Sequence, residues 1–210
     1  MKFLMKLRHF ESFKDEIINK LRTENKQLKD RIDNQDSLIQ ELQLQINLQD
    51  QYSRRQKLEV AGIPDSVEQK ELEDTVISIF NNIGVKIKSE DIIACHRLQK
   101  SKKSPHHIPA RTIVRMVNRK NCEKIKRNRK NLANLKLQKL KNPKIFINEN
   151  LCPAFQTLSF HARNLYKTRL IHSNWSSNGI VHIRIAEGEK ALKIYRLSDL
   201  RNLFKDVDFS

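Results

Sequence analysis

Apolar side chains recur every three or four residues through the first quarter of the chain. Residues 11–53 contain neither Gly nor Pro and sustain this heptad pattern over five repeats. Such a repeat predicts one long helix that forms a coiled coil through its apolar seam. Seven of the ten seam positions are Ile or Leu. The predicted oligomerisation residues are Ile18, Leu21, Asn25, Leu28, Ile32, Ile39, Leu42 and Ile46.

Charged residues beside this seam favour parallel helices in register. Glu24 would face Lys29 of a neighbouring chain, and Arg31 would face Asp36. Asn25 lies inside the seam, where a polar residue specifies the register at some cost in stability. Ile at the first seam position and Leu at the second favour a dimer, while Gln at two of the second positions leaves a trimer open. The alternative is an amphipathic helix packed on its own domain.

A second pattern, over residues 58–149, alternates between the periods of strands and helices. It predicts the order strand, helix, strand, strand, helix, strand. The strands are expected at residues 58–63, 91–98, 110–117 and 144–148, and the helices between Ser66 and Gly84 and over 118–134. Ser66 and Gln69 have the spacing of a capping box. This order predicts a ferredoxin-like module of the kind found in RNA-recognition domains.

Residues 150–206 are expected to form a small C-terminal α+β domain, which makes the whole chain α+β. Pro153 suits the first turn of a helix with an apolar stripe. Asn178-Gly179 predicts a hairpin turn, followed by a strand with Val181, Ile183 and Ile185 on one side. Ser198 is expected to cap a short final helix.

The positive charge of the chain is concentrated in one block. Residues 95–146 hold seventeen Lys and Arg against one acidic residue, Glu123, a net +16 of the chain's +17. Such a block attracts polyanions, and nucleic acid is the commonest one in a cell. The alternative is a solvated basic surface or a disordered basic tail. The β-type segment at residues 112–116 argues against a tail.

The predicted nucleic-acid contacts are basic residues that bind phosphates and sugars. They are Arg97, Arg111, Arg115, Arg119, Lys120, Lys124, Lys126, Arg127, Arg129, Lys130, Arg163 and Lys167. The strands predicted at 58–63 and 110–117 hold no aromatic residue, so base stacking there is not expected. Weak sequence preference and steep salt dependence follow. Trp175 could contact a base, although a core position under the hairpin is the favoured interpretation.

Enzymatic chemistry finds little support. The chain has four Gly and shows no phosphate-binding loop, nucleophile motif or paired metal ligands, so no catalysis, cofactor, metal or small-molecule substrate is predicted. Three cysteines far apart predict neither a disulfide framework nor a zinc site. No apolar run is long enough for a membrane span, and no secretory signal is seen, which favours the cytoplasm or nucleus.

Three stretches carry a resemblance to a known family. They are residues 52–64 (YSRRQKLEVAGIP), residues 145–151 (IFINENL), and residues 175–181 (WSSNGIV) with 197–200 (LSDL). In this order, they resemble the first-reading-frame protein of LINE-type retrotransposons and the related baculovirus few-polyhedra protein. The resemblance implies a nucleic-acid chaperone that coats RNA or single-stranded DNA as a coiled-coil oligomer.

The same resemblance implies roles for particular residues. Basic residues would hold the strand in a cleft between the module and the C-terminal domain, and Ala162-Arg163 matches the arginine motif of the C-terminal helix. The retrotransposon protein has a second arginine where this chain has Asn164. Residues 31–36 resemble the family's trimer signature, with Gln35 at an apolar position. The few-polyhedra likeness implies a role in viral structural-protein expression and nuclear virion envelopment.

Two other functions remain open at this stage. A coiled-coil adaptor could use its basic domain to dock acidic protein partners. A metal-dependent nuclease would need an acidic cluster, and the acids at positions 68, 71, 73 and 74 do not form an obvious one.

Overall fold

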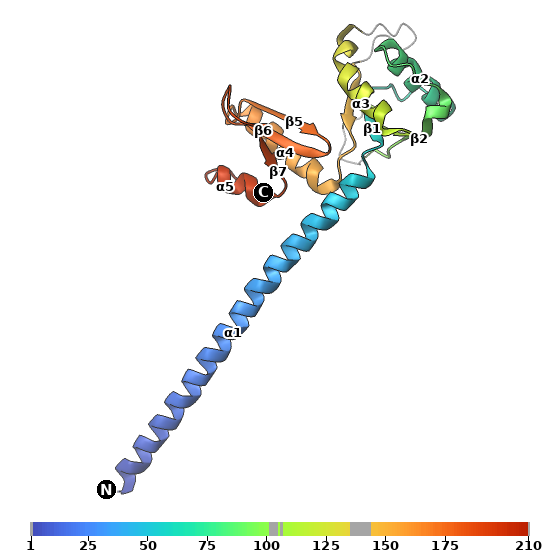
Figure 1. Ribbon diagram of the computed structural model, residues 1–210. Helices are drawn as coiled ribbons and strands as arrows, with labels where there is room; N and C mark the ends of the chain where they lie inside the picture. The colour runs from blue at the N-terminus through green and yellow to red at the C-terminus, as the bar shows by residue number, and fades with distance from the viewer. Residues whose placement is uncertain (1, 101–104, 106, 135–143, 210) are drawn as a thin grey trace. The chain divides into compact units, whose positions relative to one another are not determined.

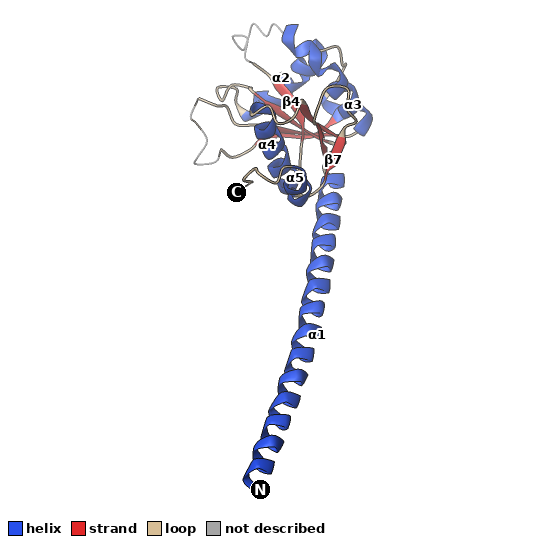
Figure 2. Ribbon diagram, turned by 90° about the vertical axis from the view of Figure 1, so that its left-hand side faces the viewer, coloured by secondary structure: helices blue, strands red, loops and turns tan. Residues whose placement is uncertain are grey.

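The computed structural model describes all residues except 1, 101–104, 106, 135–143 and 210 (Figure 1). Its described residues form two compact units, residues 1–46 and residues 47–210. The fold is α+β, with a long N-terminal helix and antiparallel sheets, which confirms the predicted fold class at this level (Figure 2). The predicted division into segments 11–53, 58–149 and 150–206 stays a prediction.

The N-terminal helix, α1, spans Lys2–Ser53 without interruption. The absence of Gly and Pro and the many helix-favouring Leu, Lys, Gln and Glu residues explain its length. Its predicted seam is open to solvent in the single chain: Leu21, Ile39 and Ile46 are 51%, 50% and 66% exposed. Of the eight predicted seam residues, Ile18 alone is half-buried. Self-association through this row of exposed Ile and Leu stays a prediction.

The larger sheet contains β1 (Lys57–Ala61), β2 (Ile92–Arg97), β3 (Thr112–Met116) and β4 (Phe146–Glu149). Its strands lie in the order β2-β3-β1-β4, and every neighbouring pair is antiparallel. Helix α2 (Gln69–Asn82) follows β1, and α3 (Arg119–Asn128) follows β3. Two 3-10 helices complete the segment, η1 (Ser89–Asp91) before β2 and η2 (Arg129–Asn134) after α3.

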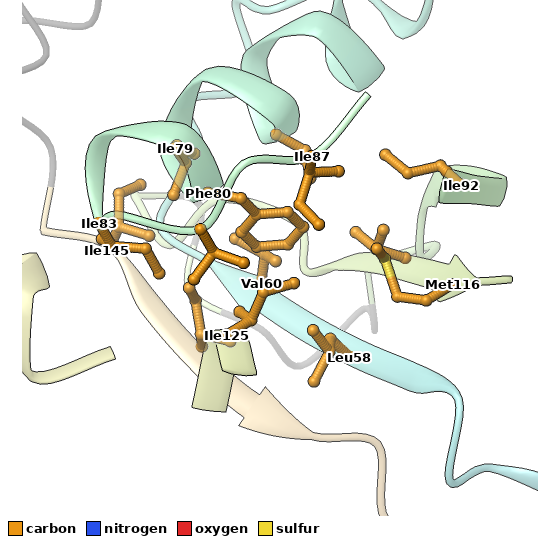
Figure 3. Packing of buried hydrophobic residues seen from close by; sticks show 14 of the residues in the cluster. Leu58, Val60, Ile79, Phe80, Ile83, Ile87, Ile92, Met116, Ile125 and Ile145 are labelled. Carbon is orange, nitrogen blue, oxygen red and sulfur yellow. The ribbon is translucent and has the colours of Figure 1, made fainter. Parts of the chain in front are cut away.

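One face of this sheet and the two helices enclose a hydrophobic core (Figure 3). Leu58 and Val60 from β1 meet Phe80 from α2 and Ile125 from α3, and all four side chains are at most 1% exposed. Burying each of these side chains stabilises the fold by about 2 kcal/mol. Because strand residues alternate between faces, the residues between them, such as Glu59, lie on the opposite, open face.

The C-terminal part has its own sheet and its own core. Helix α4 (Pro153–Lys167) is followed by β5 (Ser173–Ser177), β6 (Ile180–Arg184), β7 (Leu192–Ile194) and α5 (Leu197–Leu203), with strand order β5-β6-β7. The apolar stripe of α4 packs on Val181 and Ile183 of β6 in this core. Its members on the helix are Phe155, Leu158, Ala162 and Leu165.

The end of α1 joins the two sheets within the second unit. The Gln51 side-chain amide donates to the Asn150 carbonyl at 3.2 Å, and its oxygen accepts from the Cys152 backbone N–H at 2.8 Å. Gln51 is only 7% exposed, and Leu48 packs against the C-terminal core. The segment between β4 and α4 is therefore held by side chains from the end of the long helix.

Three local predictions were wrong. Helix α2 starts after Glu68 with no side-chain cap, so Ser66 and Gln69 do not form the predicted capping box. The α5 start is capped by Asp199, whose carboxylate accepts from the backbone N–H groups of Tyr195 and Arg196, and not by Ser198. Ile185 lies beyond the end of β6 and is 38% exposed, so it does not share the buried face of Val181 and Ile183.

Candidate nucleic-acid interface

A cleft with a cavity volume of about 920 Å³ opens between the larger sheet and the C-terminal part. We call it the basic cleft. Its walls come from the open face and edge of the larger sheet, from η2, from α4 and from β5. Among the described residues, its basic lining consists of Arg111, Arg129, Lys130, Lys144 and Arg163. Phe146 and Trp175 are its aromatic lining.

Four elements far apart in the sequence bring these cations together. Arg111 immediately precedes β3, and Lys144 lies two residues before β4. Arg129 and Lys130 begin η2, just after α3 ends. Arg163 lies on α4, where its Nε donates to the Ser159 carbonyl at 3.2 Å and holds the side chain along the helix. The cleft is thus lined by cations from both halves of the second unit.

Two carboxylates also line the cleft in the described structure, and both are paired. Arg111 donates through Nη1 to both Glu59 oxygens, at 3.1 and 3.2 Å. The Glu59 side chain is 12% exposed and the Arg111 side chain 49%, so the arginine covers the acid and still reaches solvent. The pairing leaves little free negative charge on this wall.

Glu149 is the second carboxylate and joins three elements. It accepts from Lys126 Nζ of α3 at 2.6 Å and from the backbone N–H groups of Asn178 and Gly179 at 3.0 and 2.9 Å. Burial acts to raise its pKa, but the Lys126 ammonium and the Gly179 N–H outweigh burial and hold the pKa below its ordinary value of 4.5. The carboxylate therefore stays ionised and ties the β5–β6 turn to α3.

Trp175 is half-buried and lines the basic cleft, so the favoured prediction of a core position was wrong. Its ring stacks on His182 with centroids 5.5 Å apart and planes inclined by 9°. The Arg184 guanidinium lies 5.6 Å from the ring centroid. One face of the hairpin is thus aromatic and cationic, and its contact with a base stays a prediction.

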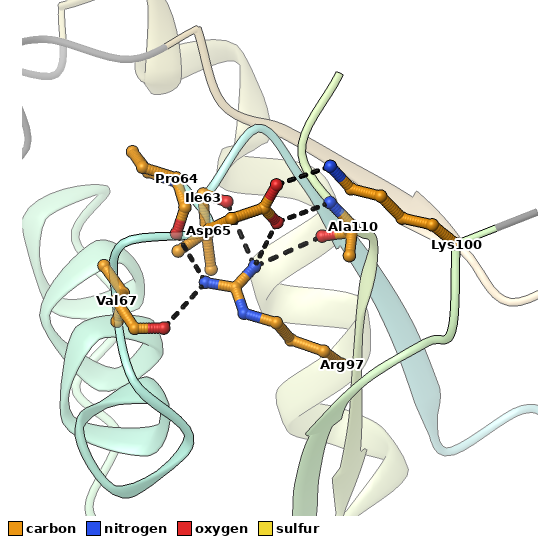
Figure 4. Close-up of polar contacts among 7 residues, drawn as sticks. All are labelled: Ile63, Pro64, Asp65, Val67, Arg97, Lys100 and Ala110. Carbon is orange, nitrogen blue, oxygen red and sulfur yellow. Dashed lines mark hydrogen bonds and ion pairs between the residues drawn. The ribbon is translucent and has the colours of Figure 1, made fainter. Parts of the chain in front are cut away.

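Arg97 has a structural position away from the basic cleft (Figure 4). Its guanidinium donates to the carbonyls of Ile63, Pro64, Val67 and Ala110 at 2.6–3.3 Å. Asp65 lies 3.8 Å away and is paired with Lys100 at 2.5 Å, and this hydrogen bond holds the Asp65 pKa below its ordinary value. Arg97 closes the turn after β1, and both of its terminal nitrogens donate to backbone carbonyls within the fold.

The remaining predicted contacts are spread over other surfaces. Arg119 pairs with Glu123 at 2.9 Å and, with Lys126, lines a smaller cavity of about 250 Å³ beside the end of α1. Lys167 lines a third cavity, next to Arg169. Four others are exposed on β3 and α3 outside the basic cleft: Arg115, Lys120, Lys124 and Arg127. Four of the predicted contacts therefore meet in the cleft: Arg111, Arg129, Lys130 and Arg163.

Lys144 and Phe146 line the cleft but were not among the contacts predicted from the sequence. Alternation could have identified Phe146, because it lies between Ile145 and Ile147, which both face the core. Lys144 had no such signal, since it precedes the strand and its direction depends on the tertiary fold.

Neither a scan of protein-family models nor a search of curated proteins gave a match for this chain. Among the described residues, no helix is both long and apolar enough to cross a membrane. The same residues contain no group of three or more His, Cys, Asp or Glu side chains that could hold a metal ion.

Proposed function

We propose that this chain is an oligomeric, non-enzymatic protein that binds single-stranded RNA or DNA with little sequence preference. The observation that carries the proposal is the convergence of Arg111, Arg129, Lys130, Lys144 and Arg163 on one cleft. Guanidinium and ammonium groups are the usual ligands of phosphate, and a row of them follows a polynucleotide backbone. Since Glu59 and Glu149 are already paired, the free charge of the cleft is positive.

The strand order of the larger sheet supports a finer proposal for the fold. Antiparallel strands in the order β2-β3-β1-β4, with a helix after β1 and after β3, agree with a ferredoxin-like, RNA-recognition-like module. The succession of long helix, module and small α+β part also agrees with the proposed kinship to the retrotransposon and few-polyhedra proteins.

The open seam of α1 supports self-association as part of this function. Exposed Ile and Leu at heptad spacing favour a parallel dimer or trimer. Linking two or three basic clefts makes the second contact with a long strand intramolecular, which raises the overall affinity without any new contact. The helix would then provide the avidity, and the clefts would provide the contacts with the nucleic acid.

Replacing Arg129, Lys130 and Arg163 together by Ala tests the proposal. The three side chains are exposed, so the fold should be retained. We expect affinity for a labelled single-stranded RNA to fall by about 100-fold at moderate salt. Each lost phosphate contact removes roughly 0.7 from the slope of log affinity against log salt, and three lost contacts remove about two. Fluorescence anisotropy measures the change.

The matched control replaces Lys193, Arg201 and Lys205 by Ala, which removes the same charge. These residues are exposed on β7, on α5 and after α5. The control should bind as the unchanged protein does. Equal losses of affinity in both variants would mean that the net charge of the protein, and not the cleft, determines binding. Unchanged affinity in both, or no binding by the unchanged protein at low salt, would refute the proposal and favour an adaptor for acidic proteins.

A further inference from the structure

We propose that Phe146 stacks on a base of the bound strand, so that the basic cleft takes single-stranded and not double-stranded nucleic acid. This inference rests on the proposed function and names the residue of the same site that would contact a base and so select single strands. It adds a stacking contact by Phe146 to the phosphate contacts proposed for the cations of the cleft.

The position of Phe146 in β4 points its ring into the cleft. Its neighbours Ile145 and Ile147 are 6% and 2% exposed and belong to the core on the helix side of the sheet. Alternation therefore turns Phe146 to the open face, where it is 48% exposed and lines the basic cleft. Its partner on β1 is Ala61, whose methyl group is too small to cover a phenyl ring.

The fold gives few reasons for an aromatic side chain at this exposed position. Core packing does not use it, since its neighbours in the strand fill that role. Lys144 Nζ lies 5.5 Å from its centroid, within the range of a cation–π contact. The ring and the ammonium together offer a flat apolar surface beside a cation, which suits a base and its adjoining phosphate.

The geometry of a duplex excludes this contact. Paired bases are stacked on their neighbours, and only an unpaired base can present a face to a side chain. Stacking on an aromatic ring contributes similarly for every base, so it selects for single strands without selecting for sequence. The central strands β1 and β3 contain no aromatic residue on which a base could stack. In this proposal, Phe146 of the edge strand β4 provides that contact instead.

The test compares the unchanged full-length protein with Phe146→Ala and Phe146→Tyr on three probes. The probes are a single-stranded oligouridine, the same backbone with abasic residues, and a blunt RNA duplex of equal length, each measured by anisotropy. Phe146→Ala should weaken oligouridine binding roughly tenfold. It should leave the abasic strand and the duplex unchanged, and Phe146→Tyr should restore oligouridine binding.

Phe160→Ala is the matched control, because Phe160 is 53% exposed on α4 and packs edge-on against His161 outside the cleft. It should bind all three probes as the unchanged protein does. Equal weakening of the oligouridine and abasic strands by Phe146→Ala would overturn the stacking, and so would no weakening of either. In both cases binding by the unchanged protein would persist, which separates this failure from that of the proposed function.

Discussion

At the scale of single residues, Glu59 restrains the charge of the cleft. It occupies the open face of β1, is largely buried, and engages Arg111 through both carboxylate oxygens. An acid in a phosphate-binding surface opposes binding unless it is neutralised, and here the neutralising cation is one that could otherwise contact phosphate. If the cleft binds phosphates as proposed, the pair would set its affinity below what its cations alone would give.

Replacing Glu59 by Gln releases Arg111 while keeping the shape of the side chain. We expect affinity for single-stranded RNA to rise about fivefold, the contribution of one additional phosphate contact. Anisotropy at a fixed salt concentration measures it. Glu71→Gln, which removes an exposed acid from α2, is the control and should change little. A fall in affinity with Glu59→Gln would mean that Arg111 must be held by the acid to bind.

Glu149 makes the stability of the fold depend on pH. Its folded pKa is lowered from 4.5, so near that pH the folded protein binds fewer protons than the unfolded chain. The carboxylate therefore stabilises the fold above about pH 4.5, and this contribution is lost as the pH falls through the folded pKa.

Glu149→Gln should lower the free energy of unfolding by about 2 kcal/mol near neutral pH, because the charged contact with Lys126 is lost. Urea unfolding at about pH 7 and about pH 3 measures the difference from the unchanged protein. The gap should narrow in acid, because the contribution of the charged carboxylate is lost as the pH falls through its lowered folded pKa. A gap of constant size at both pH values would show that the stabilisation by Glu149 does not depend on its ionisation.

At the scale of elements, periodicity predicted most of the fold. The helical spacing of Leu72, Val76 and Ile79 placed α2 correctly, and the stripe of α4 was equally clear. The caps could not be predicted, because several polar side chains near each helix start compete for the same backbone N–H groups. At the start of α5, the carboxylate of Asp199 accepts from the backbone N–H of Arg196.

The candidate site was harder to predict than the elements. Sequence alone located the basic block, but not which of its cations face one cleft. Helix α3 turns Lys120, Lys124 and Arg127 to open solvent, while Arg129 and Lys130 follow its end at Asn128 and line the cleft. The direction of a side chain after a helix end depends on tertiary packing, and so does the backbone carbonyl cluster that holds Arg97.

The long helix also makes a prediction at this scale. Replacing Ile32 and Ile39 by Asp puts two charges into the predicted seam and should abolish self-association. Light scattering should give a multiple of 24.8 kDa for the unchanged protein and 24.8 kDa for this variant. Asn34→Asp with Ser37→Asp adds the same charge outside the seam and should leave the oligomer intact. A monomeric unchanged protein would contradict the coiled coil.

At the scale of the whole molecule, each unit has one role in the proposed function. Residues 1–46 carry an apolar row without a partner in the single chain, and residues 47–210 carry the cleft with its cations and half-exposed aromatic rings. Copies joined by the helix would bind a long strand more tightly than a short one that reaches a single cleft. The cations of the basic cleft would thus act once per copy and be multiplied by assembly.

The salt dependence of binding distinguishes a phosphate-binding cleft from a surface that does not contact nucleic acid. The logarithm of the association constant for a short single-stranded RNA, too short to reach a second cleft, is measured against the logarithm of salt concentration. The slope should be shallower by about two for the Arg129, Lys130 and Arg163 triple Ala variant than for the unchanged protein, because each lost contact releases about 0.7 counterions fewer. Equal slopes for the two proteins would contradict a phosphate-binding cleft.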